Sequence, residues 1–93
     1  MNSMQIEFDS AKQAQTLAAR GLDFADAGQV FAGITLTLAD SRTDYGEQRL
    51  MTMGLMAGRE VVLIWTPRGA VRRIISMRYA NEREITKYRP NMG

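Results

Sequence analysis

The sequence predicts an α+β domain, in which two helices pack on one face of a mostly antiparallel sheet of four to five strands and another helix follows. Three observations support this class. Helical periodicity covers residues 10–32, alternation of apolar and polar side chains begins at Ile34, and a capped helical segment follows residue 80. The chain has 93 residues, enough for one small core, so residues 1–93 are expected to form a single domain.

A short strand and a helix are expected at the N-terminus. Residues 4–8 alternate apolar and polar side chains, which is typical of a half-buried strand. Ser10 and Gln13 have the spacing of a capping box, so the helix is expected to begin there. Gly21 follows the last apolar position and is expected to end the helix in a left-handed conformation.

A second helix is expected between Asp23 and Gly33. The Asp23 carboxylate can accept hydrogen bonds from the free amides at a helix N-terminus, and Gly33 interrupts the helical pattern. The apolar side chains of this segment recur on one side of the helix, and they are Phe24, Ala27, Val30 and Phe31. This side is expected to pack on the sheet.

The remaining strands are expected to form an antiparallel meander. Alternating or continuous apolar side chains mark residues 34–40, 48–56, 60–66 and 70–78. Short turns at residues 57–59 and 67–69 favour antiparallel pairing of the last three strands. A capping box then predicts a C-terminal helix that ends before Pro90, and its residues are Asn81 and Glu84.

The last strand carries several arginines, and its alternation predicts which face each one occupies. One face is expected to contact the helices, and its side chains are Val71, Ile75 and Met77. The opposite face is either a solvated surface or a site for an anion, and its side chains are Arg72, Ile74, Ser76 and Arg78. Arg73 shares the parity of the apolar side chains, so it could instead form a buried ion pair.

The composition excludes several kinds of site. The chain contains neither cysteine nor histidine, which excludes disulfides, thiolate nucleophiles and imidazole catalysis. Zinc, haem and iron–sulfur sites are therefore not expected, and neither is any other cofactor. The sequence has no apolar run of the ~18 residues that a membrane span requires and no segment typical of a signal peptide, so a cytoplasmic protein is expected.

Charge is distributed unevenly along the chain. Residues 1–44 contain three basic and six acidic side chains, whereas residues 45–93 contain nine basic and four acidic ones. Ten of the twelve basic residues are arginine, whose planar guanidinium group suits paired contacts with phosphate or carboxylate. The second half is therefore expected to bind an anionic partner.

Three stretches of the sequence resemble the BrnT family of bacterial toxins. They are FDSAKQAQTLAARGLDFADAGQVF, YGEQR with the strand that contains Gly54, and RRIISMRYANEREITKY, and the resemblance extends from about Glu7 to Tyr88. It implies a fold like that of RelE and a metal-independent endoribonuclease that inhibits translation and growth. It also implies a type II toxin–antitoxin pair, in which a BrnA-type antitoxin with a ribbon-helix-helix, DNA-binding fold neutralises the toxin. Operator DNA would then be bound only through the antitoxin.

Metal-independent cleavage of RNA makes specific demands on a site. The 2′-hydroxyl attacks the adjacent phosphorus, so the site needs a base, an acid and fixed positive charge at the transition state. Glu47 is the candidate base and Tyr88 the candidate acid. The whole predicted catalytic set is Lys12, Glu47, Arg49, Arg73, Arg78 and Tyr88, and the predicted RNA-binding residues are Arg68, Arg72, Ser76 and Arg83.

Structural roles are the alternative for several of these residues. Glu47 could form a surface ion pair with Arg49, and Tyr88 could belong to the core with its hydroxyl in water. Lys12 is different, because it lies early in the first helix, where a cation opposes the helix dipole. A bound phosphate or a partner's carboxylate would explain a lysine at that position.

Arg20 marks a departure from the family pattern, which usually has Lys-His-Gly where this chain has Ala19-Arg20-Gly21. Arg20 is expected to complement the negative end of the helix dipole and to bond the free carbonyls there. The departure leaves a second hypothesis open. In it, the chain is a non-enzymatic or decayed toxin that binds the antitoxin and helps to repress their operon.

Overall fold

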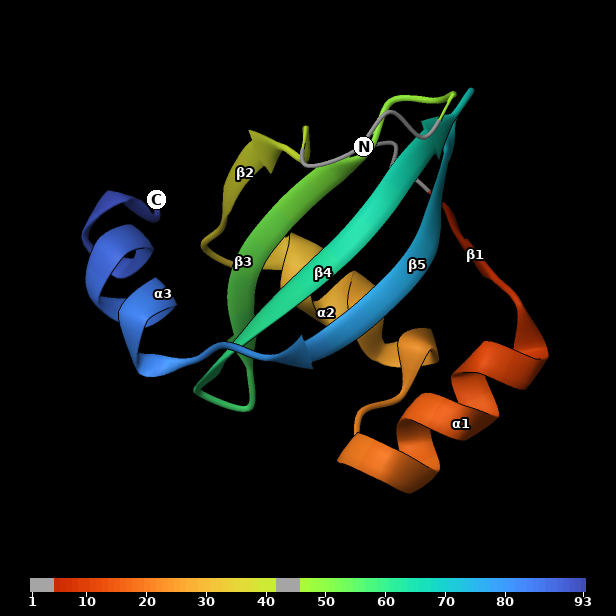
Figure 1. Ribbon diagram of the computed structural model, residues 1–93, viewed down its shortest axis with the longest axis horizontal. Coiled ribbons are helices and arrows are strands. Elements are labelled where there is room, and N and C mark those ends of the chain that lie inside the picture. Colours follow the sequence, from red (N-terminus) through yellow and green to blue (C-terminus); the bar gives the residue numbers. More distant parts are fainter. Residues whose placement is uncertain (1–4, 42–45) are drawn as a thin grey trace.

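The structure is a computed structural model that describes residues 5–41 and 46–93, and it confirms the predicted α+β class. Figure 1 traces its elements in chain order. They are β1 (Gln5–Phe8), α1 (Ser10–Arg20), the 3₁₀ helix η1 (Phe24–Asp26), α2 (Ala27–Ala32), β2 (Leu36–Ala39), β3 (Leu50–Met56), β4 (Arg59–Arg68), β5 (Val71–Tyr79), α3 (Glu82–Tyr88) and the 3₁₀ helix η2 (Arg89–Asn91).

The five strands of the described residues form one sheet in the order β1-β5-β4-β3-β2. β1 runs parallel to β5, and the other neighbouring strands are antiparallel. Figure 1 shows α2 crossing one face of the sheet, while α1 lies beside β5 and α3 lies at the opposite side. None of the described helices is long and apolar enough to cross a membrane.

The main core lies between α2 and the sheet. Its buried side chains are Leu22, Phe24, Ala27, Val30, Val61, Leu63, Trp65, Ile74 and Met77. We call this side of the sheet the helix face. The opposite side, which we call the open face, carries Leu38, Met51, Ile64, Ser76 and Arg78, as the strand pairing and the period of two require.

A β-bulge in β5 shifts the alternation of its side chains. Ser76 pairs with Ile64, but Ile74 pairs with the next residue of β4, so Ile75 is the extra residue. The predicted helix-facing set of Val71, Ile75 and Met77 is therefore correct only for Met77. The buried apolar side chains of β5 are Ile74 and Met77, so the predicted place of Ile74 on the opposite face is wrong. Alternation predicts a regular strand and gives no sign of an inserted residue, which is why the prediction failed.

Because of the bulge, Arg72 lies on the helix face. The prediction that it shares a face with Ser76 and Arg78 is therefore wrong. Its guanidinium carbon is 4.1 Å from the ring centroid of Phe31 and 5.3 Å from that of Trp65. Burial lowers the pKa of Arg72, since desolvation disfavours the charged form. Contact with the two aromatic faces compensates part of that cost.

The first helix is capped by Asp9, one residue before the predicted cap, Ser10. Asp9 is the N-cap, and its Oδ1 accepts hydrogen bonds from the backbone amides of Ala11 and Lys12 at 2.8 and 3.2 Å. The Ser10–Gln13 capping box is therefore wrong, and the Gln13 amide instead donates to Asp23 at 2.8 Å. The predicted left-handed end at Gly21 is confirmed, with φ of 71°.

Asp9 should make the folding stability depend on pH in the acidic range. The amides of Lys12 and Ala11 bond the ionised carboxylate and lower the pKa of Asp9 below its usual 3.8. A lowered pKa in the folded state gives stability that is present above the unfolded pKa and is lost as the pH falls through the folded value. We expect Asp9→Asn, which keeps the capping oxygen, to lose less stability than the native chain on acidification. Thermal melting between pH 7 and pH 2 measures this, and equal losses would contradict it.

The second helix is capped by Asp23 as predicted, with the carboxylate accepting from the amide of Ala25 at 2.9 Å. Its first turn is the 3₁₀ helix η1, and the α-helical part begins at Ala27. The approach of this helix to the sheet depends on Gly54 of β3. A Cβ built on Gly54 would lie 2.4 Å from Cγ1 of Val30, so only glycine fits there without movement.

Both predicted turns of the meander exist, but one is displaced. Ala57 and Gly58 have φ of 50° and 81° and connect β3 to β4, as predicted. The second turn lies at residues 69–70, because Pro67 and the following arginine continue β4. Beyond Trp65, β4 pairs only with β5, and proline is tolerated where one side of a strand is unpaired.

Candidate functional site

A pocket of about 270 Å³ lies on the open face, between the sheet and α3. Four strands and α3 contribute to it, so residues far apart in the sequence meet there. Its apolar floor is formed by Leu38, Met51 and Ile64. Its polar residues are Asp40, Ser41, Arg78, Glu84 and Tyr88. We call it the α3 pocket, and it has the mixture of an apolar floor and a few polar groups that is typical of ligand sites.

Arg78 and Glu84 form the main polar contact of the α3 pocket. Both terminal nitrogens of Arg78 donate to the two carboxylate oxygens of Glu84, each at 2.7 Å. Glu84 also accepts from the backbone amide of Asn81, whose side chain in turn accepts from the amide of Glu84. The predicted capping box of α3 is thus confirmed, and the same carboxylate fixes the guanidinium group of Arg78.

A second pocket of about 300 Å³ lies between α1 and β5. The helix contributes Lys12, Gln15, Thr16, Ala19 and Arg20, and the strand contributes Ile75 and Ser76. We call it the α1 pocket. The Nη1 of Arg20 donates to the carbonyl of Met77 at 2.9 Å. Arg20 thus bonds a carbonyl of β5, whereas the sequence predicted bonds to carbonyls at the end of its own helix.

A third group of charged residues lies at the other end of the sheet. Glu47 is 3.4 Å from Nε of Arg49 and 3.5 Å from Nη2 of Arg68. Arg73, which the bulge places on the open face, has Nη1 3.3 Å from the carboxylate of Glu7. The alternative prediction for Arg73 was a buried ion pair. The ion pair exists, but it is half-exposed and not buried.

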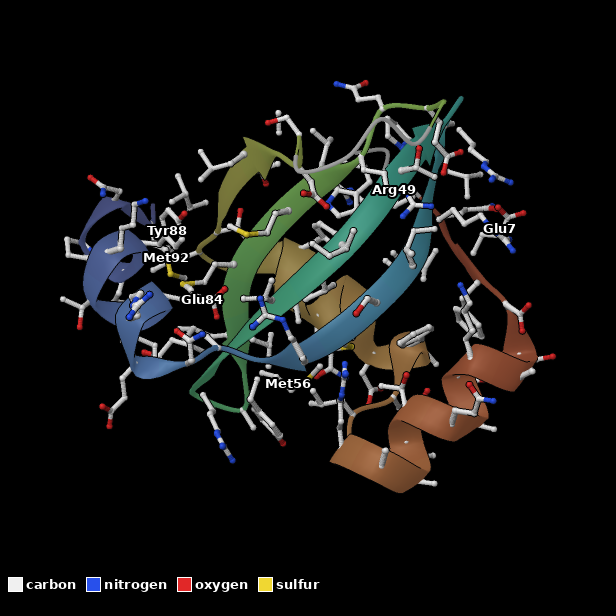
Figure 2. All side chains as sticks on the ribbon, viewed as in Figure 1. Glu7, Arg49, Met56, Glu84, Tyr88 and Met92 are labelled. Carbon is white, nitrogen blue, oxygen red and sulfur yellow. The ribbon has the colours of Figure 1, made fainter. Side chains whose placement is uncertain are left out.

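The predicted catalytic residues therefore do not form one cluster. Figure 2 shows Glu84 and Tyr88 at one end of the molecule and Arg49 and Glu7 near the other. Arg68 pairs with Val71, whereas Val62 pairs with Arg78, so six residues of β4 separate the two groups. Six residues of a strand span about 20 Å. Glu47 and Arg78 accordingly belong to separate groups of side chains.

The other predicted residues lie between these groups or apart from them. Lys12 and Ser76 line the α1 pocket, Arg72 stacks on aromatic rings of the helix face, and Arg83 is exposed on α3. Sequence reasoning missed the role of Glu84 as the partner of Arg78, because Glu84 was already explained as a helix cap. It also missed Asp40 and Ser41, which directly precede residues 42–45, outside the described residues.

The α3 pocket brings side chains of opposite charge together. Among the described residues, no group of three or more acidic side chains lies close enough together to hold a metal ion. The charged lining of the α3 pocket consists of one guanidinium group and two carboxylates, from Arg78, Asp40 and Glu84. A fixed cation beside carboxylates that could accept a proton is a suitable arrangement for chemistry at a phosphate group.

Comparison with known proteins identifies the family. A search of curated proteins finds no match. A scan of protein families matches residues 8–84 to the family described as "Ribonuclease toxin, BrnT, of type II toxin-antitoxin system". This range includes every strand after β1 and all residues of both pockets, except that Tyr88 of the α3 pocket lies just beyond it. The chain therefore belongs to the BrnT family of ribonuclease toxins of type II toxin–antitoxin systems.

Proposed function

We propose that this toxin is a metal-independent endoribonuclease and that the α3 pocket is its active site. The observation that carries the proposal is Arg78, held by Glu84 through two hydrogen bonds of 2.7 Å at a pocket that Tyr88 also lines. A guanidinium group fixed in this way offers preorganised positive charge, which is usually the largest contribution to catalysis at a phosphate. Cleavage of messenger RNA in the cytoplasm would then inhibit translation and growth.

In the proposed reaction, the 2′-oxygen attacks the adjacent phosphorus and the bond from phosphorus to the 5′-oxygen breaks. A base removes the proton of the 2′-hydroxyl, and an acid protonates the departing 5′-oxygen. The products are a 2′,3′-cyclic phosphate and a 5′-hydroxyl, so atoms and charge balance without a redox partner. Arg78 stabilises the negative charge that develops on the phosphoryl oxygens, because the guanidinium group of an arginine keeps its positive charge in proteins.

We assign the proton transfers to side chains of the α3 pocket. The base is one of its two carboxylates, Asp40 or Glu84, and the acid that protonates the leaving oxygen is the phenol of Tyr88, which also lines the pocket. Each carboxylate can be tested by removing its charge alone. Loss of the base should abolish the acidic limb of the pH–rate profile, whereas loss of a positioning residue should lower the rate at every pH. Profiles of Asp40→Asn and Glu84→Gln distinguish the two roles, and two unchanged profiles would contradict the assignment.

The charged residues at the other end of the open face are proposed to bind RNA away from the cleaved bond. Glu47 lies 3.4 Å from Arg49 and 3.5 Å from Arg68, so two arginines gather around one carboxylate in this group. Arg73 lies on the same face, two residues before Ile75 of the α1 pocket. Together they extend positive charge along the sheet, which suits the phosphate backbone of a single strand.

The antitoxin is proposed to be of the BrnA type, a ribbon-helix-helix protein that alone contacts operator DNA. Acidic side chains of this partner would cover the arginines of the open face and displace RNA, because charges of opposite sign guide two binding surfaces together. A non-enzymatic toxin that only binds the antitoxin is the alternative. Expression of the chain should stop growth and cause degradation of RNA. Co-expression of a BrnA-type antitoxin should restore growth and leave the RNA intact. Absence of RNA fragments, both in cells and with the purified protein, would favour the alternative.

A further inference from the structure

The α1 pocket adjoins the α3 pocket along β5, which contributes residues to both. Ser76 lines the α1 pocket, and it pairs with Ile64, which lines the α3 pocket. Arg78 follows Ser76 by two residues on the same face, so their backbone positions are about 7 Å apart. This spacing is comparable to that of successive phosphates in an extended nucleic-acid strand. A strand with one phosphate at Arg78 would therefore bring its neighbour to Ser76.

The lining of the α1 pocket is suited to an anion. It contains the cations Lys12 and Arg20, the hydroxyl groups of Thr16 and Ser76, and the amide of Gln15, and it contains no carboxylate. Arg20 is held in place because its Nη1 donates to the carbonyl of Met77 at 2.9 Å. Asp9 lies near Lys12, but its Oδ1 accepts from the backbone amides of Ala11 and Lys12. The pocket thus presents positive charge from α1 and hydrogen-bond donors from both α1 and β5.

We infer that the α1 pocket binds the RNA phosphate next to the one that is cleaved at Arg78. This inference rests on the proposed function, because it takes the α3 pocket as the place of cleavage. Lys12 and Arg20 neutralise the charge of that phosphate, and Ser76 and Thr16 donate hydrogen bonds to it. The arrangement also explains why a lysine lies in the first turn of α1, where it opposes the helix dipole. Lys12 is accordingly a binding residue, separate from the groups that transfer protons.

Two neighbouring alanines of α1 allow a matched test. Ala18 and Ala19 are both exposed in the last turns of the helix, but only Ala19 lines the α1 pocket. Ala19→Glu and Ala18→Glu change the net charge and the helix equally, so a difference between them reports the pocket itself. The probe is a labelled 2′-O-methyl oligonucleotide, which binds but cannot be cleaved by attack of a 2′-hydroxyl. We expect Ala19→Glu to weaken its binding about tenfold and Ala18→Glu less than twofold.

The opposite substitution gives the opposite result if the inference is correct. Ala19→Lys should tighten binding more than Ala18→Lys, and Lys12→Met should weaken it whether or not Ala19→Glu folds, with thermal melting as the check on folding. The inference would be overturned if Ala19→Glu and Ala18→Glu bound the probe equally and Lys12→Met bound it as tightly as the native chain. A loss of antitoxin neutralisation in Ala19→Glu with unchanged RNA affinity would overturn it too, because the pocket would then serve the partner.

Failure of the inference and failure of the proposed function are distinguishable. Binding of the 2′-O-methyl probe needs no catalysis. If Ala19→Glu weakens this binding but the native chain does not cut RNA, only the proposed chemistry is contradicted. Rapid RNA cleavage with no difference between Ala19→Glu and Ala18→Glu would leave the chemistry intact and remove the phosphate site.

Discussion

Replacing Arg78 by alanine is expected to lower the rate of RNA cleavage by about 100- to 1,000-fold, the usual effect of removing one preorganised group that stabilises a transition-state charge. Arg78→Lys should retain part of the activity, since a lysine keeps the charge but cannot form the two parallel hydrogen bonds with Glu84. Cleavage of a defined oligonucleotide by each purified variant measures the effect. The melting temperature of each variant is compared with that of the native chain, to show that the variant is folded.

The control for this experiment is Arg89→Ala. Arg89 is also an arginine paired with a glutamate, with Nη1 3.4 Å from the carboxylate of Glu60, but it lies outside both pockets. Its removal changes the net charge equally and should leave cleavage within about twofold, since an exposed pair contributes little. Alanine at position 78 leaves Glu84 without this partner, so the double variant Arg78→Ala/Glu84→Gln shows whether the loss persists when the carboxylate is neutral. An Arg78→Ala protein that is folded and fully active would remove the α3 pocket as the active site.

Arg49→Ala gives the complementary result. If the Glu47 group at the other end of the sheet only binds RNA, this variant should raise KM and leave kcat nearly unchanged. A loss of kcat as large as that of Arg78→Ala would instead place the chemistry with Glu47, the base that the sequence suggested.

Gly54→Ala is expected to be among the most destabilising single substitutions in the chain. The new Cβ would lie 2.4 Å from Cγ1 of Val30 and 3.2 Å from Cγ2 of Thr35, so α2 would have to move away from β3. Val30 cannot turn aside easily, because a β-branched side chain in a helix has one preferred rotamer. Overpacking of this kind costs about 1–3 kcal/mol, a large part of the stability of a small domain.

A double-mutant cycle tests this explanation. Val30→Ala alone should also destabilise the protein, since Val30 is fully buried and a cavity would replace its methyl groups. Combined, the two substitutions should cost less than the sum of the single ones, because the alanine at position 54 would occupy the space that Val30 leaves. Chemical unfolding of the four proteins gives the coupling. Additive losses would mean that the contact between Gly54 and Val30 does not determine how closely α2 packs.

The sequence predicts the class of fold because it depends on features that are local. The left-handed end at Gly21, the caps at Asp23 and Asn81, and the turn at residues 57–58 are each specified by neighbouring residues. The parallel pairing of β1 with β5 is not a local feature, because the sequence of residues 4–8 does not indicate which strand they pair with. The extra residue in β5 is likewise invisible in the alternation, and it reversed the predicted faces of Arg72 and Arg73.

The candidate site was predicted only in part, for the same reason. Arg78 and Tyr88 do meet in one pocket, because the turn between β5 and α3 is short enough to bring them together. Glu47 precedes β3 and pairs with residues at the far end of β4, a position that depends on the strand register. Glu84 was overlooked because one local role, the helix cap, seemed sufficient, although its second contact crosses to β5.

The measurement that tests the central claim most directly uses two oligonucleotides in the presence of a chelator. One is all ribose, and the other carries a single 2′-deoxy sugar immediately before the bond that is cut. The account predicts that the native chain cuts the all-ribose strand without free metal ions, leaving a 2′,3′-cyclic phosphate. It also predicts that the bond after the deoxy sugar stays intact, because that sugar has no 2′-hydroxyl to attack the phosphorus. Cleavage of that bond, or a requirement for a divalent metal ion, would contradict the account.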